Sequence, residues 1–280
     1  MKNHHILFLL ALAVMPLTVA RAQIAEIDSA TIPQHPDDLQ FGELQFEVPD
    51  GDRHRHTLTN GVVVYIVEDH QLPLINLSVT ARLGGFLDPA DRPGLAATTG
   101  AMLRRGGTAS LSAEEFDEKV EFLAANIESA TSATRGTASL NCITPVLDES
   151  LQLFFDMLKS PRFQEDRLEL EKEQLLEEMK QRNDQPQTIS QRNWAWLMRG
   201  MDSYLARQLT AAEVDAIGRD DLVRFHARYW QPQNLILGVS GDVDTAGILA
   251  SLERHFADWK ATESATEWPP QAPDQVPEPG

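Results

Sequence analysis

Apolar and polar residues alternate through the first third of the chain, a pattern typical of strands that bury one face. Asn60-Gly61 stands between two β-branched runs within residues 56–67, which is a strong signal for a hairpin with a two-residue turn. The alternation stops at Gly84-Gly85. The strands predicted in this region are 44–48, the two arms of the hairpin, and 74–83.

The spacing becomes helical after Pro93-Gly94, and helices dominate beyond Pro145. Ser112 and Glu115 form a capping box that predicts the start of a second helix. The predicted helices are 95–104, 112–125, 148–159, 165–182, 188–198, 219–229 and 245–255, and the predicted strands are 127–131, 135–144 and 235–241. This mixture predicts an α+β fold with a mostly antiparallel sheet and helices packed on one side.

Residues 1–22 have the features of a secretory signal peptide. A charged start is followed by a short apolar block and by Ala20-Arg21-Ala22, a small-x-small cleavage site. The block is too short to span a bilayer, so no membrane anchor is expected after cleavage. We therefore predict export across the inner membrane, with the periplasm as the expected compartment.

The remaining chain is predicted to have three parts. Residues 23–43 are polar and contain two prolines, which is typical of a loose segment. Residues 44–260 are predicted to form one ordered lobe. Residues 261–280 are rich in proline and are predicted to form an extended linker or tail.

Charge and cysteine content exclude two classes of function. The formal net charge of −18 argues against nucleic-acid binding, because phosphate contacts require a basic surface. The single cysteine, Cys142, excludes an internal disulfide framework and a cysteine-rich metal site. Its mixed apolar surroundings in the sequence predict a buried, unreactive thiol.

Short motifs between Leu58 and Val243 together resemble the N-terminal lobe of the pitrilysin/insulinase family, especially its bacterial members similar to mitochondrial processing peptidase. The matching pieces are Leu58-x-Asn60-Gly61, Leu72-Pro73, Gly94-Leu95-Ala96, Gly107-Thr108, Asp220-Asp221-Leu222, Tyr229-Trp230-Gln231-Pro232-Gln233-Asn234 and Gly241-Asp242-Val243. The resemblance implies one lobe of a metallopeptidase clamshell.

The family's zinc motif, H-x-x-E-H, is degenerate in this chain. Family members carry it on the helix that opens with Gly-Leu-Ala, where two histidines bind Zn²⁺ and the glutamate is the general base. Here the same five positions read Ala97-Thr98-Thr99-Gly100-Ala101. No catalytic residue and no cofactor are therefore predicted, although the family uses zinc.

The resemblance also implies a third zinc ligand near Glu178, with Glu171 as its supporting glutamate. These positions are seven apart and share one face of a helix, predicted to point partly inward. Without histidine partners, the site would be vestigial. The same glutamates also suit an ordinary solvated, charge-rich helix.

Family members bind peptides as an added strand on one sheet edge. The resemblance places this edge at Ile127, Glu128, Ser129 and Ala130, within residues 126–131. An ordinary edge strand would have the same sequence pattern, so both interpretations remain open.

Three hypotheses follow. In the first, the chain is a non-catalytic homologue that pairs with a zinc-bearing family subunit or a second lobe and helps to form a peptide-binding chamber. In the second, it is a zinc metalloendopeptidase with a rearranged site that includes Glu178, Glu171 and a remote histidine. In the third, it is the truncated half of a two-lobed family member, since the sequence stops within a proline-rich segment. The first predicts a protein that is inactive alone.

Overall fold

The computed structural model describes residue 35 and residues 50–261 and 265–269. The predicted signal peptide, the predicted strand 44–48 and nearly all of the segment 23–43 lie outside the described residues. The boundaries proposed at residues 22, 44 and 260 therefore remain predictions.

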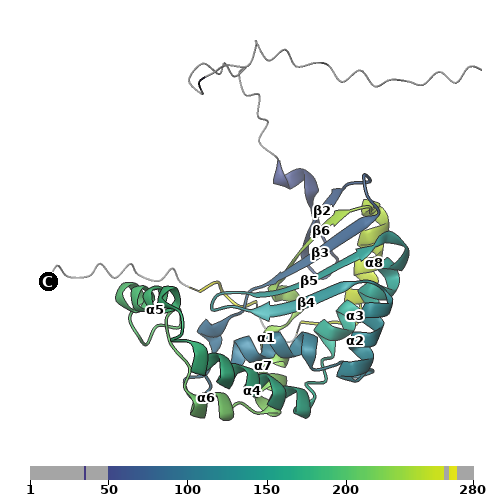
Figure 1. Cartoon of the computed structure of the whole chain (residues 1–280). Helices are drawn as coiled ribbons and strands as arrows, with labels where there is room; N and C mark the ends of the chain where they lie inside the picture. Colours follow the sequence, from purple (N-terminus) through teal and green to yellow (C-terminus); the bar gives the residue numbers. More distant parts are fainter. Residues whose placement is uncertain (1–34, 36–49, 262–264, 270–280) are drawn as a thin grey trace, which may run out of the picture. The chain divides into compact units, whose positions relative to one another are not determined.

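Six strands form one sheet in the order β1-β2-β6-β3-β5-β4 (Figure 1). The strands are β1 Arg55–Thr57, β2 Val63–Glu68, β3 Leu74–Ala81, β4 Asn126–Thr131, β5 Gly136–Ile143 and β6 Leu235–Gly241. Neighbouring strands run antiparallel except β2 and β6, which are parallel. The prediction of an α+β fold with a mostly antiparallel sheet is confirmed.

The predicted hairpin joins β1 to β2 through Asn60-Gly61. Gly61 has φ +89°, in the left-handed region that glycine adopts without strain. The Gly61 N–H donates to the Leu58 oxygen at 2.8 Å, and the Leu58 N–H donates to the Val62 oxygen at 2.9 Å. The turn thus fixes the register that pairs Thr57 with Val63.

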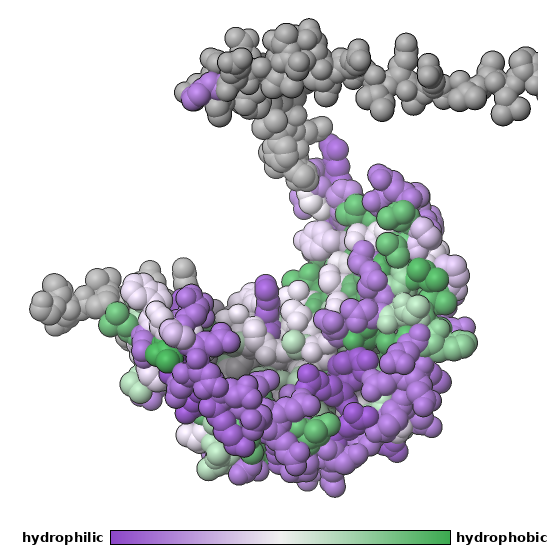
Figure 2. Space-filling model, in the orientation of Figure 1, coloured by the Kyte–Doolittle hydropathy of each residue, from purple (hydrophilic) through white to green (hydrophobic). Residues whose placement is uncertain are grey.

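The two faces of the sheet have different environments. On β3, Ile75, Leu77 and Val79 are buried, whereas Asn76 and Ser78 on the opposite face are exposed. Most of the helices lie on the side of the face that carries the buried residues (Figure 1). Pale and green residues are frequent over the sheet, while hydrophilic residues dominate over α2 (Ala113–Phe122) and α4 (Glu165–Gln181) (Figure 2). One sheet face therefore builds the core and the other is open.

Eight α-helices are found among the described residues. They are α1 Leu95–Arg105, α2 Ala113–Phe122, α3 Leu147–Lys159, α4 Glu165–Gln181, α5 Pro186–Arg199, α6 Ala211–Asp215, α7 Arg219–Tyr229 and α8 Thr245–Phe256. The seven predicted helices are confirmed, and α6 was not predicted. Its first residues follow a capping box formed by Thr210 and Glu213. Helix α1 contacts β4, α4 and α7 and is therefore central to the lobe.

Part of the predicted C-terminal linker is tied to the lobe. The Thr266 N–H donates to Asn234 Oδ1 at 2.6 Å, and Asn234 Nδ2 donates to Thr266 Oγ1 at 3.1 Å. In the part of the chain that the structure describes, no helix is long and apolar enough to cross a bilayer.

Candidate functional site

The degenerate motif lies on α1, whose first turn is fixed by the side chain of Asp88. Its two carboxylate oxygens accept the Gly94 N–H at 2.8 Å and the Ala96 N–H at 2.7 Å, and these donors lie at the start of the helix. Burial raises the pKa of Asp88, because the two N–H donors and the charge of Arg207 offset desolvation only in part. Asp88 therefore orients the N-terminal end of α1, where the motif begins.

The three key motif positions differ in exposure. Ala97 is exposed, Ala101 is half-buried and Gly100 is buried. Methyl groups and a hydrogen atom cannot ligate a metal or accept a proton. The three positions that the family resemblance aligns with the two histidines and the glutamate therefore offer no metal ligand and no proton acceptor from their side chains.

Gly100 has no room for a side chain. A Cβ atom built on it would overlap the N and Oγ1 atoms of Thr131 and lie 2.8 Å from the carbonyl carbon of Ala130. Ser129 Oγ also donates to the Gly100 oxygen at 2.7 Å, which holds β4 against the helix. Strand β4 therefore occupies the space that a glutamate side chain at position 100 would need.

The two glutamates on α4 lie in different environments. Glu171 is buried and forms an ion pair with Arg105 of α1, whose Nη1 also donates to Gln174 at 3.1 Å. Glu178, seven residues later, is exposed. The expectation that both point inward is right for Glu171 and wrong for Glu178, because only the first half of α4 packs on α1.

The residues that the structure describes do not form a zinc site. Within residues 50–261 and 265–269, no group of three or more His, Cys, Asp or Glu side chains is placed to hold a metal ion. The motif positions supply no donor, and the remaining glutamates are divided between an ion pair and solvent. The described residues therefore do not fit the zinc ion that the family resemblance implies.

The histidines on helices are engaged elsewhere. His226 is buried, and its Nε2–H donates to the Leu158 oxygen at 2.8 Å. Desolvation lowers its pKa to about 4, so the ring is neutral. His255 stacks on Phe155 with ring centroids 4.6 Å apart.

Strand β4, which the family resemblance implies as a peptide-binding edge, lies at one edge of the sheet and pairs with β5 alone among the described strands. Arg104 Nε donates to the Ile127 oxygen at 2.8 Å, so this carbonyl points away from β5. Because alternate residues of an antiparallel strand point to opposite sides, the N–H and C=O groups of Ser129 also point away from β5. The structure thus leaves Ser129 as the centre of the open edge, with Arg104 over Ile127.

Two cavities follow the open edge of β4. One, of about 580 Å³, is lined by Ala101, Arg104, Arg105, Asp117 and strand residues 126–130. The other, of about 280 Å³, continues past Thr131 and is lined in part by Ala97, Asp88, Tyr204 and Leu209. The groove therefore runs along β4 over two of the degenerate motif positions, and we call it the edge groove.

Sequence reasoning missed several residues of the edge groove. Arg104, Arg105, Asp117, Tyr204 and Leu209 belong to no motif, and their positions depend on the packing of α1 and of the loop before α6. The two adjacent arginines at the end of α1 are visible in the sequence. No local sequence pattern indicates that Arg104 faces β4.

The chain matches one family over most of its described length. Residues 63–202 match the family described as Insulinase (Peptidase family M16), and residues 216–280 match the Peptidase M16 inactive domain. Zinc protease PqqE of Helicobacter pylori is 26% identical over 208 residues, which cover 73% of this chain and 46% of that relative. The chain spans about half the length of the relatives it matches.

Solved structures share the fold. A structure described as the peptidase M16 inactive domain from Pseudomonas fluorescens has a TM-score of 0.70 and 22% identity, covering 77% of this chain and 52% of that chain. The periplasmic protease PqqL from Escherichia coli has a TM-score of 0.69 and 18% identity, covering 78% and 25%. At these identities, the likeness shows the fold alone.

Proposed function

The chain belongs to the insulinase (M16) peptidase family, and we propose that it is a non-catalytic homologue that serves as a peptide-binding partner subunit or lobe. The observation that carries this proposal is the contact between Gly100 and Thr131. Loss of catalysis here is not a matter of side-chain chemistry alone, because the backbone of β4 fills the place of the base. A scaffold with this packing can still hold a peptide without cleaving it.

The edge groove would hold the peptide. An extended segment added to β4 would pair with the N–H and C=O groups of Ser129, in a mode driven by the backbone with little side-chain selectivity. Ile127, Glu128 and Ala130 would line the same strand, as the family resemblance implies. The expected ligand is therefore an extended polypeptide segment of broad sequence.

A second lobe or a zinc-bearing family subunit would complete the chamber. The aligned part of this chain covers only about half of the relatives' length, and one sheet face is open among the described residues. Exposed apolar residues on that face, Tyr65, Val67, Leu74 and Ile143, suit contact with another surface better than with water. The signal-peptide pattern of residues 1–22 supports the periplasm as the compartment of this proposed assembly.

The catalytic part of the proposal is tested with the purified chain alone. We expect less than about 0.1 equivalent of zinc per chain, the level of a trace contaminant, whereas a family site holds one zinc ion. We also expect no chelator-sensitive cleavage of fluorogenic peptides. Stoichiometric zinc together with chelator-sensitive cleavage would favour the rearranged metalloendopeptidase instead. In that case, Glu178→Gln would abolish the activity.

Peptide binding is tested with two variants of one residue. Ser129→Pro removes the outward N–H but no hydrogen bond to β5, and proline is tolerated at such edge positions. Ser129→Ala removes only the hydroxyl that bonds to Gly100. We expect about tenfold weaker binding of an extended test peptide to Ser129→Pro than to Ser129→Ala, since one hydrogen bond of about 1.4 kcal/mol is lost. Equal binding by both variants would show that β4 is not the peptide site.

The partner role is tested by mixing the chain with a family subunit that has an intact H-x-x-E-H motif. We expect a defined complex in light scattering and faster peptide cleavage than by that subunit alone. If the two chains elute separately at micromolar concentration and activity is unchanged, the partner role is wrong, whatever the result for peptide binding.

A further inference from the structure

A cleft between α2 and α3, two helices that lie in contact, has an apolar floor and charged walls (Figure 1). It has a volume of about 370 Å³ and shares no lining residue with the edge groove. Its apolar lining residues are Leu111, Phe122, Leu123 and Leu153, and its charged ones are Lys119, Glu149 and Asp156. We call it the α2–α3 cleft, and it plays no part in the proposed function.

Phe122 stands at the rim of this cleft. It is the last residue of α2 and is 87% exposed, more than any other large apolar residue that the structure describes. Its neighbours in the lining, Leu123 and Leu153, are only 6% exposed, and Leu111 is half-buried. The ring therefore extends an apolar floor that is already formed. An exposed aromatic residue beside a pocket is a typical anchor of a protein interface, because covering it removes apolar surface from water.

The walls of the cleft carry charges that are not paired within the lobe. The side chains of Glu149 on α3 and Lys119 on α2 form no hydrogen bond or ion pair with any residue that the structure describes. The carboxylate of Asp156 accepts a neutral amide, from Gln152 Nε2 at 2.8 Å. The α3 wall thus offers two carboxylates without an ion-pair partner among the described residues, against one ammonium group on α2.

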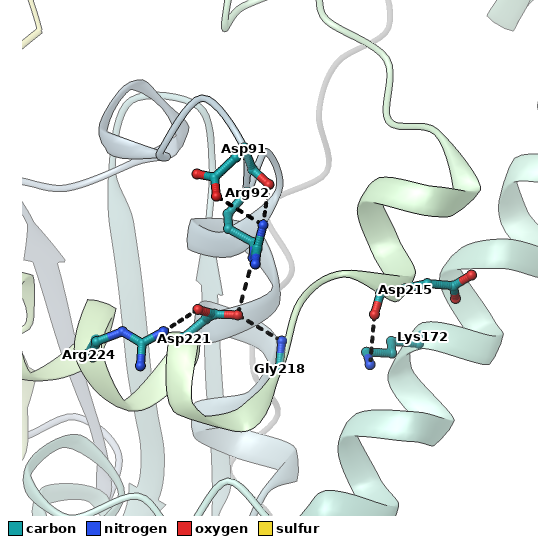
Figure 3. Close-up of polar contacts among 7 residues, drawn as sticks. All are labelled: Asp91, Arg92, Lys172, Asp215, Gly218, Asp221 and Arg224. Carbon is teal, nitrogen blue, oxygen red and sulfur yellow. Dashed lines mark hydrogen bonds and ion pairs between the residues drawn. The ribbon is translucent and has the colours of Figure 1, made fainter.

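The charges beside α7 have the opposite arrangement. Asp221 accepts Arg92 Nε at 3.4 Å and the Gly218 N–H at 3.0 Å, and it forms an ion pair with Arg224 (Figure 3). These charges compensate one another within the lobe, so they favour no charged ligand. In the α2–α3 cleft, by contrast, the carboxylates are available to a cation from outside the lobe.

The position of Phe122 favours a large occupant. A small molecule bound on the floor of the cleft would leave most of a ring that is 87% exposed in water, whereas a polypeptide can extend over the rim. The charge of the α3 wall favours a basic group. A second copy of this chain, which also has a net charge of −18, would add repulsion instead.

We propose that the α2–α3 cleft docks a basic, apolar segment of a partner polypeptide. One apolar side chain of the segment would pack against Phe122, and a Lys or Arg side chain would face Glu149 and Asp156. The Lys119 ammonium, on the opposite wall, would disfavour a basic segment slightly, so its removal should strengthen binding. This inference does not depend on the proposed function.

The probes are fluorescein-labelled peptides studied by anisotropy at low ionic strength. The basic peptide is Gly-Lys-Leu-Phe-Lys-Gly, one twin has Glu in place of both Lys residues, and a second twin has Ser in place of Leu and Phe. We expect the basic peptide to bind at least about tenfold more tightly than either twin, because the first twin places like charges together and the second lacks the apolar contact. Equal binding of the basic peptide and its acidic twin, or no binding at millimolar concentration, would overturn the proposal.

Phe122→Ser tests the apolar contact, since its exposed side chain can be replaced without disturbing the core. We expect about tenfold weaker binding of the basic peptide. The matched control is Trp194→Ser, which removes a 63% exposed ring from α5, outside the cleft, and should bind as the unchanged protein does. Equal affinity of the two variants would show that Phe122 is not the anchor.

Two further variants test the charge in opposite directions. We expect about threefold weaker binding to Glu149→Gln and about threefold tighter binding to Lys119→Gln, the size of one exposed ion pair. A change of the same sign in both, or no change in either, would overturn the assignment of a basic ligand. Ser129→Pro should leave this binding unchanged, which separates its outcome from that of the edge groove.

The alternative occupants are tested directly. If 4-phenylbutylamine displaces the basic peptide at an equal concentration, the cleft takes a free amine and not a polypeptide. If light scattering shows a dimer that Phe122→Ser dissociates, the cleft is covered by a second copy of the chain. Either result would overturn the proposal, and we expect neither.

Discussion

Gly100 of α1 and Thr131 of β4 lie in direct contact, and no Cβ atom fits between them. The contact is to backbone as well as to side chain, because the Thr131 nitrogen and the Ala130 carbonyl carbon both border the space. A flexible side chain could move aside, but a paired strand cannot do so cheaply. Glycine at position 100 is therefore a structural requirement of this packing.

Gly100→Ala is expected to lower the free energy of unfolding by at least about 2 kcal/mol, since overpacking a tight helix–strand contact has costs of this order. Urea denaturation followed by circular dichroism measures the change. Gly51→Ala is the matched control, because its new methyl group would meet nothing within 4 Å. Equal stability of the two variants would contradict the proposed role of Gly100.

Zinc-motif residues should be tolerated at positions 97 and 101 but not at position 100. Ala97→His with Ala101→His places two imidazoles on the accessible side of α1, and we expect this double variant to fold and to gain weak zinc binding. Adding Gly100→Glu should lower the melting temperature sharply and give no peptidase activity, because the strand blocks the side chain. Metal analysis and thermal melts of both variants measure this. A stable and active triple variant would show that β4 can be displaced by the glutamate side chain at little cost in stability.

Glu171 and Glu178 should respond differently to the same change. Glu171→Gln weakens the ion pair between α4 and Arg105 of α1, and we expect a loss of about 1 kcal/mol in unfolding free energy. Glu178→Gln alters an exposed side chain and should stay within about 0.5 kcal/mol of the original value. Denaturant titrations of the two variants are compared. A larger loss at Glu178 would indicate a buried role that the structure does not show.

Local sequence signals predicted most elements correctly. The capping box of Ser112 and Glu115 starts α2 with both of its hydrogen bonds, and the Asn60-Gly61 turn joins β1 to β2. Each signal acts over a few residues, so it can be recognised without knowledge of the fold. The helix predicted at residues 95–104, to which the family resemblance assigns the degenerate motif, is present as α1.

Local sequence signals could not predict how elements far apart in the sequence pack together. Strand β6 lies between β2 and β3 and runs parallel to β2, although Val63 and its partner Ile236 are far apart in the sequence. Helical periodicity predicted that Glu171 and Glu178 lie on the same face of α4. Only Glu171 is buried, because it pairs with Arg105 at the end of α1. The contact of Arg104 with Ile127 likewise depends on how α1 crosses the sheet edge.

Arg104 is predicted to restrict access to the sheet edge. Its guanidinium group donates a hydrogen bond to the Ile127 oxygen, pairs with Asp117 and lies over the ring of Phe116. Arg104→Met frees the carbonyl for a peptide N–H, so we expect about threefold to tenfold tighter peptide binding, in keeping with one gained hydrogen bond of about 1 kcal/mol. Fluorescence anisotropy with a labelled peptide measures the change.

Arg167→Met is the control for Arg104→Met. It also breaks an arginine–carboxylate pair, with Glu114, but it does not touch β4. Its peptide affinity should equal that of the unchanged protein. If Arg104→Met binds no more tightly than Arg167→Met, the guanidinium group does not limit access to the edge.

His226 makes the stability of the lobe depend on pH in the acidic range. Its pKa falls from 6.5 to about 4 on folding, so between these values the unfolded chain binds the additional proton. Stability is therefore expected to fall as the pH drops from about 6.5 to about 4, by at most about 3 kcal/mol from this group. Urea denaturation at a series of pH values measures the slope.

His226→Gln keeps an amide donor near the Leu158 oxygen but cannot titrate, so its stability should change less over the same pH range. Part of the slope should remain, because burial also lowers the pKa of His255. His70 acts in the opposite direction. Its hydrogen bond to Asp242 raises its pKa, so that its contribution is present below about pH 6.5 and lost as the pH rises through the raised value. An unchanged slope in His226→Gln would show that the buried ring is not the group that titrates.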